Sequence, residues 1–350
     1  MRPDISIIIP CYNASKYLPQ CMASLESQTI GMERLQLIFV DDASVDGGKT
    51  WECILEFEKK YPGSVVAIQL EKNRCQGGAR NEGLRYAAGD YIGFVDADDW
   101  IEPSMYEQLY RCMQEFDCDA ADCRLVVNLE NGTECVQEKA NDRLDAFVAS
   151  TLEGDDHWID AFMGGPYGGG VVTGLYKREL ILDNQIYFPE HLKYEDNYWQ
   201  SIMLLYVKKV YHSSADLYHY RENGESTIHA RNNRHHFDRL EIEERKLQTY
   251  KELGVFEKFH EQIERDFLRM YYCNTLTLMW LRFDVPPYDV FQKMEETVKR
   301  LFPDYRKNPY FDTDSVDKML VGLIGRNLSE VQFIEAGKVM ISCLDELDEV

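Results

Sequence analysis

Three carboxylates that could hold a metal ion stand within four residues of one another. Asp96, Asp98 and Asp99 directly follow the apolar segment 91–95 (YIGFV). Like charges this close repel one another unless a cation lies among them. Hard oxygen ligands select Mg²⁺ or Mn²⁺, whose coordination is usually completed by water and substrate phosphates. The group therefore indicates a divalent-metal site, and the alternative is an acidic turn in which Asp99 caps a helix that begins near Pro103.

A second pair of carboxylates, Asp41 and Asp42, comes directly after the apolar run 35–40 (LQLIFV). Oxygens in that position could accept hydrogen bonds from a nucleobase N–H or from ribose hydroxyls. A capped loop without a ligand is the alternative, because aspartate is common in turns.

A third group combines Asn73 with Gly77, Gly78 and Arg80. Glycine lets a backbone approach a ligand closely, and an arginine on the following helix could offer a fork to a diphosphate. By itself, a pair of glycines ahead of a helix is weak evidence for a site.

These groups need a scaffold, and the first 130 residues predict one. Continuous apolar runs at 6–9, 35–40, 65–70 and 91–95 are typical of strands buried on both faces. The segments between them predict helices, which begin after Ser15, near residue 50 and near residue 79 and end by residues 60 and 88 in the last two cases. Strands separated by single helices favour a mostly parallel sheet with right-handed crossovers. In such sheets ligands bind beyond the carboxyl ends of the strands, which is where all three polar groups lie.

The pattern changes in the rest of the chain. Segment 124–138 predicts a hairpin with a tight turn at Asn131-Gly132, and a glycine-rich stretch follows at 164–170. Beyond residue 231 apolar residues recur at helical spacing until Pro286-Pro287. We therefore expect a boundary at residue 230, which divides the chain into 1–230, with halves 1–127 and 128–230, and a helical region 231–350.

Composition excludes several classes of protein. The 350 residues are 45% hydrophobic, which is enough for a large core and too much for a disordered chain. With 38 basic against 61 acidic residues, the formal net charge is −23. Such a surface repels nucleic-acid phosphates and anionic lipids, so we expect no nucleic-acid partner.

Neither a membrane span nor a disulfide framework is expected. The longest uncharged apolar stretch, 270–281, is about 12 residues, against the roughly 20 that a spanning helix needs. No signal peptide precedes Pro10, so a cytoplasmic location is expected. The ten cysteines include no C-x-x-C pair, which indicates small buried side chains rather than ligands.

Taken together, these segments resemble the family 2 glycosyltransferases, inverting enzymes of GT-A fold. The resemblance covers about the first 225 residues and rests on four motifs in order: SIIIPCYNASKYLPQCMASLESQT, LIFVDDASVDGG, NRCQGGARNEGLRYAAGDYIGFVDADDWIEP and KYEDNYWQ. It implies an α/β fold of Rossmann-like type, with a mostly parallel sheet between helices, followed by a C-terminal helical region. It also implies a nucleotide-sugar donor, most often UDP-linked, and Mn²⁺ or Mg²⁺.

The resemblance assigns roles to residues of this chain. It implies that Asp98 is the direct metal ligand, that Asp96 completes the D-x-D motif, and that Asp42 is the uracil partner. Other residues are implied to line the nucleotide-sugar: Pro10, Tyr12, Asn13, Asn73, Gly78 and Arg80.

Glu195 and Asp196 resemble the Glu-Asp motif of the family, in which the aspartate deprotonates the acceptor hydroxyl. An inverting transfer is a single in-line displacement at the anomeric carbon. It needs one carboxylate on the acceptor side and a metal on the diphosphate side, roles that Asp196 and Asp98 could fill. The alternative for the pair is a capped helix start ahead of Tyr198.

The segment from Tyr220 onward resembles one that folds over the diphosphate in many relatives. Arg221 could offset the charge of the leaving group, and His229 could be an extra metal ligand. The glycine-rich stretch 164–170 could shape the acceptor cleft. Three aromatic residues could stack on sugar rings, although packing is their more usual role: Trp158, Tyr167 and Trp199.

Two other functions remain open. A nucleotidyltransferase would need a basic triphosphate loop near its N-terminus, and the stretch 10–15 holds no arginine. A catalytically silent nucleotide-sugar-binding scaffold would have a damaged D-x-D or Glu-Asp motif, and both are whole. The favoured function is a hexosyl- or N-acetylhexosaminyl-transferase of cell-surface polysaccharide synthesis. Its expected acceptor is a glycan or lipid-linked molecule, with at most peripheral contact at the inner face of the cell membrane.

Overall fold

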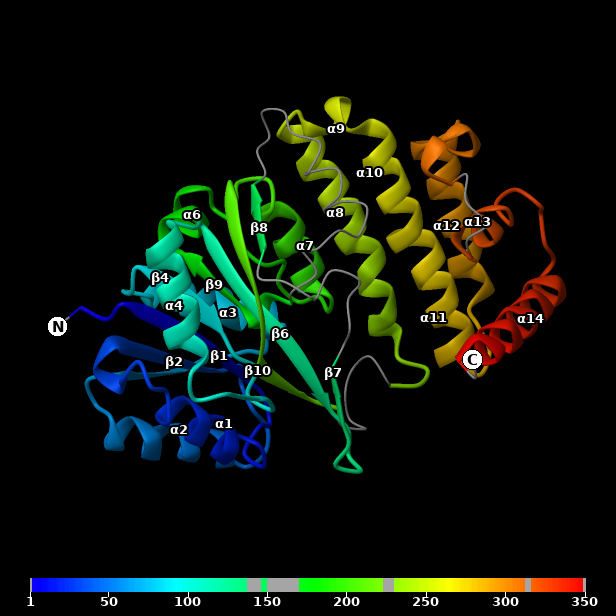
Figure 1. The fold of residues 1–350 in the computed structure, drawn as a ribbon. Helices are drawn as coiled ribbons and strands as arrows, with labels where there is room; N and C mark the ends of the chain where they lie inside the picture. Colours follow the sequence, from blue (N-terminus) through cyan, green and yellow to red (C-terminus); the bar gives the residue numbers. More distant parts are fainter. Residues whose placement is uncertain (1, 137–145, 150–169, 223–229, 312–315, 349–350) are drawn as a thin grey trace. The chain divides into compact units, whose positions relative to one another are not determined.

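One mixed sheet organises the first part of the chain (Figure 1). In the computed structural model, which describes residues 2–136, 146–149, 170–222, 230–311 and 316–348, the sheet order is β3-β2-β1-β4-β9-β6-β10-β5, with β7 on β6 and β8 on β10. The strands are β1 Ile5–Cys11, β2 Leu35–Asp41, β3 Val65–Gln69, β4 Tyr91–Phe94, β5 Trp100–Ile101, β6 Ala120–Asn128, β7 Glu134–Val136, β8 Ala146–Ala149, β9 Gly174–Lys177 and β10 Lys209–Arg221.

The four strands that the apolar runs predict are confirmed, and they are mutually parallel. β1 pairs with β2 and β4, and β2 pairs with β3, all in parallel. β9 then joins β4 to β6 in antiparallel fashion, and β6 pairs in parallel with β10. The hairpin is also confirmed, because Gly132 has a φ of +82° in the turn between β6 and β7.

Helices cover both faces of the sheet. Those of the first unit are α1 Leu18–Glu26, α2 Lys49–Lys60, α3 Cys75–Tyr86, α4 Met105–Phe116, α6 Arg178–Asp183 and α7 Glu195–Met203, with short 3₁₀ segments at Met32–Arg34 and Val171–Thr173. Ile7 and Ile9 of β1 belong to the cluster that α1, α2 and α4 cover. Ile8 points to the other face, where a Cβ at Gly83 of α3 would lie 2.5 Å from its side chain. This alternation along β1 explains why the whole strand is buried.

Three element boundaries differ from the sequence prediction. α1 begins at Leu18 with Tyr17 in the capping position. α3 begins at Cys75, so Gly77 and Gly78 lie inside a helix and not in a loop before it. Asp99 does not cap α4, which starts at Met105, because its carboxylate is buried against β10.

Contacts divide the chain into two compact units, Met1–Asn223 and Gly224–Val350. The second is helical: α8 Asp238–Glu252, α9 Val255–Lys258, α10 His260–Phe267, a π-helical segment Leu268–Asn274, α11 Thr275–Arg282, α12 Tyr288–Leu301, α13 Val316–Val321 and α14 Glu330–Asp348, with 3₁₀ segments at Arg234–Phe237, Tyr305–Lys307 and Pro309–Phe311. Its core encloses an ionic trio in which Lys246 Nζ lies 2.9 Å from Glu243 and 3.1 Å from Asp266. Among the described helices of the chain, none is both long and apolar enough to cross a bilayer.

Candidate active site

The ends of β1 and β2 bring the first predicted residues together. Pro10 pairs with Val40 and Cys11 with Asp41, and the Asp42 N–H then donates to the Cys11 carbonyl at 2.8 Å. Pro10 is buried within β1, so it supports the loop above it. Tyr12 follows with a side chain that is 49% exposed, and its ring is open to a planar ligand.

Asn13 braces this loop against the next one. Its backbone N–H donates to Ser44 Oγ at 2.9 Å, and its Oδ1 accepts from the Val45 N–H at 2.8 Å. These bonds hold Asn13 at a φ of +50°, in the left-handed region. The loops after β1 and β2 therefore form one rigid edge.

Asp42 is buried and held from the β3–α3 turn. Its Oδ1 accepts from the Arg74 N–H at 2.7 Å, and its carbonyl accepts from Asn73 Nδ2 at 3.1 Å. Burial raises the pKa of Asp42 to about 6 despite the hydrogen bond from Arg74. Asn73 thus acts on the loop that carries Asp42.

Arg80 joins the two acidic motifs. Its Nη2 lies 2.7 Å from Asp96 Oδ1 and its Nη1 lies 2.6 Å from Glu195 Oε1. The arginine is 3% exposed, and although burial disfavours its charge, the two carboxylates raise its pKa. The structure therefore uses both terminal nitrogens of Arg80 to bring the D-x-D and Glu-Asp segments to one point.

The Glu-Asp pair begins α7, and its two members differ in environment. Glu195 is 3% exposed, and burial raises its pKa to about 7 while Arg80 opposes the shift. Asp196 keeps part of its surface exposed, and its pKa is also raised by burial and lowered by Arg80. Asp196 is therefore the more exposed member of the pair.

Asp99 and Arg221 tie the D-x-D turn to β10. Asp99 is buried and accepts from Tyr218 Oη at 2.7 Å and from the Arg221 N–H at 2.8 Å. Arg221 Nε donates to the Asp98 carbonyl at 2.8 Å, and Nη2 donates to Gln20 Oε1 at 2.6 Å. These bonds hold the Arg221 side chain against the turn that carries Asp98.

Two aromatic rings flank the guanidinium of Arg221. Its central carbon lies 4.7 Å from the Trp100 ring centre and 5.3 Å from that of Tyr17. The pairing of β10 with β5 and the loop before α1 produce this stack. Nothing in the sequence spacing singled out Tyr17, Gln20 or Trp100.

The donor set suits a divalent ion that a substrate completes. Within the described ranges, no three His, Cys, Asp or Glu side chains group as a self-sufficient metal site. Asp98 is partly exposed and Asp96 is 23% exposed at its side chain. Mg²⁺-type sites commonly use one or two carboxylates together with substrate phosphates and water, which these two residues match.

Some predicted residues lie elsewhere or outside the described ranges. Trp199 is fully buried, donates to the Ile186 carbonyl and stacks on Phe188, so it belongs to the core. Gly78 lies in α3, where its missing side chain makes room for Arg74. His229, Trp158, Tyr167 and 164–169 lie outside the described residues.

Backbone strain marks the same edge of the sheet. Among the described non-glycine residues with positive φ, five adjoin these loops: Asn13, Ala43, Cys75, His191 and Tyr194. Such conformations persist only where surrounding contacts hold them, and they cluster at functional sites. The sequence carried no signal for most of them, because alanine, cysteine and tyrosine are not turn formers.

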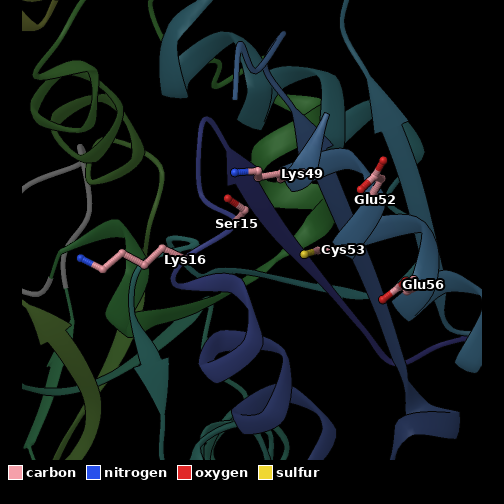
Figure 2. A pocket seen from close by; sticks show the side chains of 6 residues that line it. All are labelled: Ser15, Lys16, Lys49, Glu52, Cys53 and Glu56. Atoms are coloured by element: carbon pink, nitrogen blue, oxygen red, sulfur yellow. The ribbon is translucent and has the colours of Figure 1, made fainter. Parts of the chain in front are cut away.

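An open depression of about 390 Å³ lies nearby, between the start of α1 and α2 (Figure 2). It is lined by Ser15, Lys16, Lys49, Glu52, Cys53 and Glu56. In Figure 2 the Lys16 side chain points away from the other five. None of the predicted site residues lines it, so the candidate active site is the edge that carries Asp42, Asp98 and Asp196.

Comparisons with known proteins agree with this architecture. The family model described as Glycosyl transferase family 2 matches residues 6–179. The chain is 30% identical over 278 residues to the uncharacterized glycosyltransferase YibD of Escherichia coli. The aligned region covers 76% of this chain and 78% of that protein. The chain is also 30% identical over 221 residues to the poly(ribitol-phosphate) beta-glucosyltransferase of Bacillus spizizenii, which covers 62% of this chain and 32% of that protein.

The fold has a solved counterpart. The structure of Staphylococcus aureus TarS 1–349 in complex with UDP-GlcNAc aligns with a TM-score of 0.53 and 20% identity, over 85% of this chain and 92% of that chain. This likeness confirms the GT-A type of fold that the four motifs imply. With the family model, the extended match to YibD and the shared fold in agreement, the chain belongs to glycosyl transferase family 2 and is a glycosyltransferase.

Proposed function

We propose that this glycosyltransferase moves a sugar from a UDP-sugar to an acceptor hydroxyl with inversion, assisted by Mn²⁺ or Mg²⁺, in the synthesis of a cell-surface glycan. The observation that carries the proposal is the bridge through Arg80, which holds Asp96 and Glu195 on one guanidinium. The D-x-D carboxylates on the donor side and the Glu-Asp pair on the acceptor side are thereby linked through one side chain.

The donor's nucleoside has a matched surface. Tyr12 offers an exposed ring to the base, and Asp42 offers a carboxylate oxygen to a base N–H. Solved TarS structures that share the fold hold UDP and UDP-GlcNAc, which supports uridine as the nucleoside. A hexosyl or N-acetylhexosaminyl donor is the corresponding sugar class.

Asp98, with Asp96 beside it, would hold the divalent ion. Two like charges about 4 Å apart repel by roughly 4 kcal/mol at an effective dielectric of 20, so a diphosphate needs help to settle beside carboxylates. When bound, the ion supplies Lewis-acid stabilisation of the diphosphate leaving group. Arg221, held against the Asp98 carbonyl, adds a fixed positive charge to the same region.

Asp196 takes the proton of the acceptor hydroxyl in this proposal. Arg80 and burial act on it in opposite directions, and the net shift is an upward one that makes it a better base than an exposed aspartate. Glu195, which Arg80 binds directly, orients the start of α7.

The names of relatives support the acceptor class that we propose. Two relatives carry poly(ribitol-phosphate) in their names, and another is named a minor teichoic acid biosynthesis protein. The chain spans less than a third of the B. spizizenii protein's length. We therefore propose only a class of acceptor, which is a surface glycan or its lipid-linked precursor. We place the reaction in the cytoplasm at the membrane face, with peripheral contact only, since a net charge of −23 disfavours anionic lipid.

A donor panel tests this function. UDP- and GDP-sugars would be titrated by calorimetry in Mn²⁺ and then in EDTA, with sugar transfer measured in parallel. We expect UDP-sugars to bind in Mn²⁺ and to lose most of that affinity in EDTA, and Asp98→Ala to lose the metal dependence. Asp90→Ala, at a side chain that is 61% exposed, is the control and should behave as the wild type.

The same panel separates the alternatives. Formation of pyrophosphate from UTP and a sugar phosphate would show a nucleotidyltransferase. Donor binding without transfer or hydrolysis would show a silent scaffold. Equal affinity in Mn²⁺ and EDTA would remove the metal from the proposal.

A further inference from the structure

Arg74, in the turn between β3 and α3, contacts both halves of the candidate site. Its backbone N–H donates to Asp42 Oδ1 at 2.7 Å, on the donor side. Its carbonyl accepts from the His191 N–H at 3.0 Å, and its guanidinium binds Glu190 through Nε at 3.0 Å and Nη2 at 2.5 Å. Both of these partners lie in segment 184–194, which leads from α6 into the Glu-Asp pair and is here named the base loop.

We propose that Arg74 is a positioning residue, which through its fork on Glu190 holds the base loop, and with it Asp196, in register with the donor-side carboxylate Asp42. The inference rests on the proposed function and adds two residues to it. Arg74 lies within the third motif but the family resemblance assigns it no role, and Glu190 lies outside the four motifs. Neither residue needs to touch the substrate.

The base loop has no regular structure of its own to fix it. His191 and Tyr194 have φ values of +62° and +65°, which cost energy for side-chain-bearing residues. Since the loop is strained, contacts from outside must hold it. These contacts include Trp199 of α7, which donates to the Ile186 carbonyl, Phe94 of β4 against the Phe188 ring, and several from α3 and the turn before it.

α3 and the turn before it contact the base loop at three successive positions. Asn81 accepts from the Phe188 N–H at 2.9 Å and donates to the Phe188 carbonyl at 2.8 Å. A Cβ at Gly77 would lie 2.4 Å from the Pro189 carbonyl, so loop and helix are in direct contact there. The Arg74–Glu190 pair closes the end nearest to Asp42.

The pair has the geometry of a strong contact. Two parallel N–H···O bonds from one guanidinium to one carboxylate fix orientation as well as distance. The side chains are 29% and 32% exposed, so water screens the pair only in part. A point charge without the fork would hold the loop less well.

Backbone and side chain of Arg74 do separable work, which makes the inference testable. Arg74→Ala removes the contact to Glu190 and keeps the N–H that binds Asp42. We therefore expect kcat for transfer to fall roughly 10- to 100-fold, the effect of a small misplacement of a catalytic group, with donor affinity within about three-fold of wild type. Glu190→Ala should give the same split, and the double variant should be no worse than either single one.

The rate is expressed per donor-binding site, counted by calorimetry, so that loss of folded protein does not mimic loss of positioning. Arg74→Lys, which keeps the charge without the fork, should recover part of the rate. Arg85→Ala is the matched control, because Arg85 of α3 binds Glu82, as Arg74 does, but has no contact with Glu190. It should retain the wild-type rate.

Hydrogen exchange of the base loop supplies a second readout that does not need activity. In Arg74→Ala we expect faster exchange at 186–194, including the His191 and Phe188 amides, and no change in Arg85→Ala. Unchanged exchange together with an unchanged rate per site would overturn the inference, and so would single effects that multiply in the double variant. If the wild type binds no nucleotide-sugar at all, the proposed function fails, while the exchange data still decide whether Arg74 holds the loop.

Discussion

At the scale of single residues, neighbouring carboxylates in this site differ because their surroundings differ. Glu195 is buried and bound to Arg80, whereas Asp196, one position further along α7, keeps contact with solvent. Pairs of titratable groups whose surroundings push their pKa values apart are typical of acid–base sites. In the mechanism that we propose, Glu195 holds the start of α7 and Asp196 is the base.

Substitution of the base should remove catalysis and leave the donor site intact. For Asp196→Asn we expect transfer to fall by about 10²- to 10⁴-fold, the usual cost of losing a general base, with UDP affinity within a few-fold of wild type. Transfer assays and calorimetry measure the two quantities. Asp183→Asn, at the exposed end of α6, is the control. Transfer near the wild-type rate in Asp196→Asn would move the role to Glu195 or His191.

Donor affinity should depend on pH through Asp42. Its pKa is raised to about 6 by burial, and the ionised carboxylate accepts a hydrogen bond from the base N–H much more strongly than the protonated acid does. We expect affinity for a UDP-sugar to fall by about ten-fold between pH 7.5 and pH 5 in saturating Mn²⁺. A UDP-sugar is the right probe, because its diphosphate diester does not titrate in this range. Asp42→Asn should bind weakly with a flat profile, and an equally steep profile in that variant would assign the titration to another group.

The raised pKa of Asp42 also makes the stability of the folded protein depend on pH. The folded state binds the Asp42 proton more tightly than the unfolded state does. The contribution of Asp42 to the free energy of unfolding is therefore greatest below the ordinary carboxyl pKa and is lost as the pH rises through about 6. A site that binds its ligand with an ionised, buried aspartate gives up some stability at neutral pH.

At the scale of elements, α3 is the part that connects the two sides of the site. It carries Arg80, which reaches both acidic motifs, and it packs against the base loop through Gly77. The glycine is required by that contact, because a side chain would meet backbone atoms that cannot move aside.

Gly77→Ala tests this packing. Alanine in a helix is usually favourable by about 0.5–1 kcal/mol relative to glycine. Here its Cβ would lie 2.4 Å from the Pro189 carbonyl, and overpacking of this kind costs about 1–3 kcal/mol. We expect a net fall in the free energy of unfolding, measured in urea, together with reduced transfer. Gly63→Ala has no atom within 4 Å of the new Cβ and should change stability by less than about 0.5 kcal/mol. A stabilised Gly77→Ala would show that the base loop moves freely.

At the scale of the whole molecule, charge is the dominant feature. The formal net charge is −23, and the described residues of the candidate site all belong to the unit Met1–Asn223. An anionic donor must approach this acidic surface. Local cations such as Arg221 act within a few ångströms, whereas the net charge acts over a Debye length.

Salt should therefore help UDP to bind when no metal is present. Raising the salt concentration from 10 mM to 100 mM shortens the Debye length from about 30 Å to about 10 Å and screens the long-range repulsion. We expect the affinity for UDP in EDTA to rise a few-fold over that range. Uridine, which carries no charge, is the control and should show no change. An affinity for UDP that falls with salt would show that the local cations outweigh the net charge.

Much of this architecture followed from the sequence alone. Buried strands of a parallel sheet need apolar residues on both faces, so continuous apolar runs such as 35–40 indicate where the strands lie. Since parallel strands present their carboxyl ends at one edge, the sequence alone predicts that the polar groups after those runs lie near one another. The family resemblance added the roles of Asp98 and Asp196, which remain predictions.

Tertiary structure alone decided which side chains meet. Arg80, predicted near the diphosphate, lies between Asp96 and Glu195, and Arg74 binds Glu190. α3 starts at Cys75, and its Gly77, which looks like a loop residue in the sequence, serves a close helix–loop contact. The physical reason is common to all of these. Burial patterns are local and repeat along the chain, whereas an ion pair or a close approach depends on how distant segments pack, and no periodicity records it.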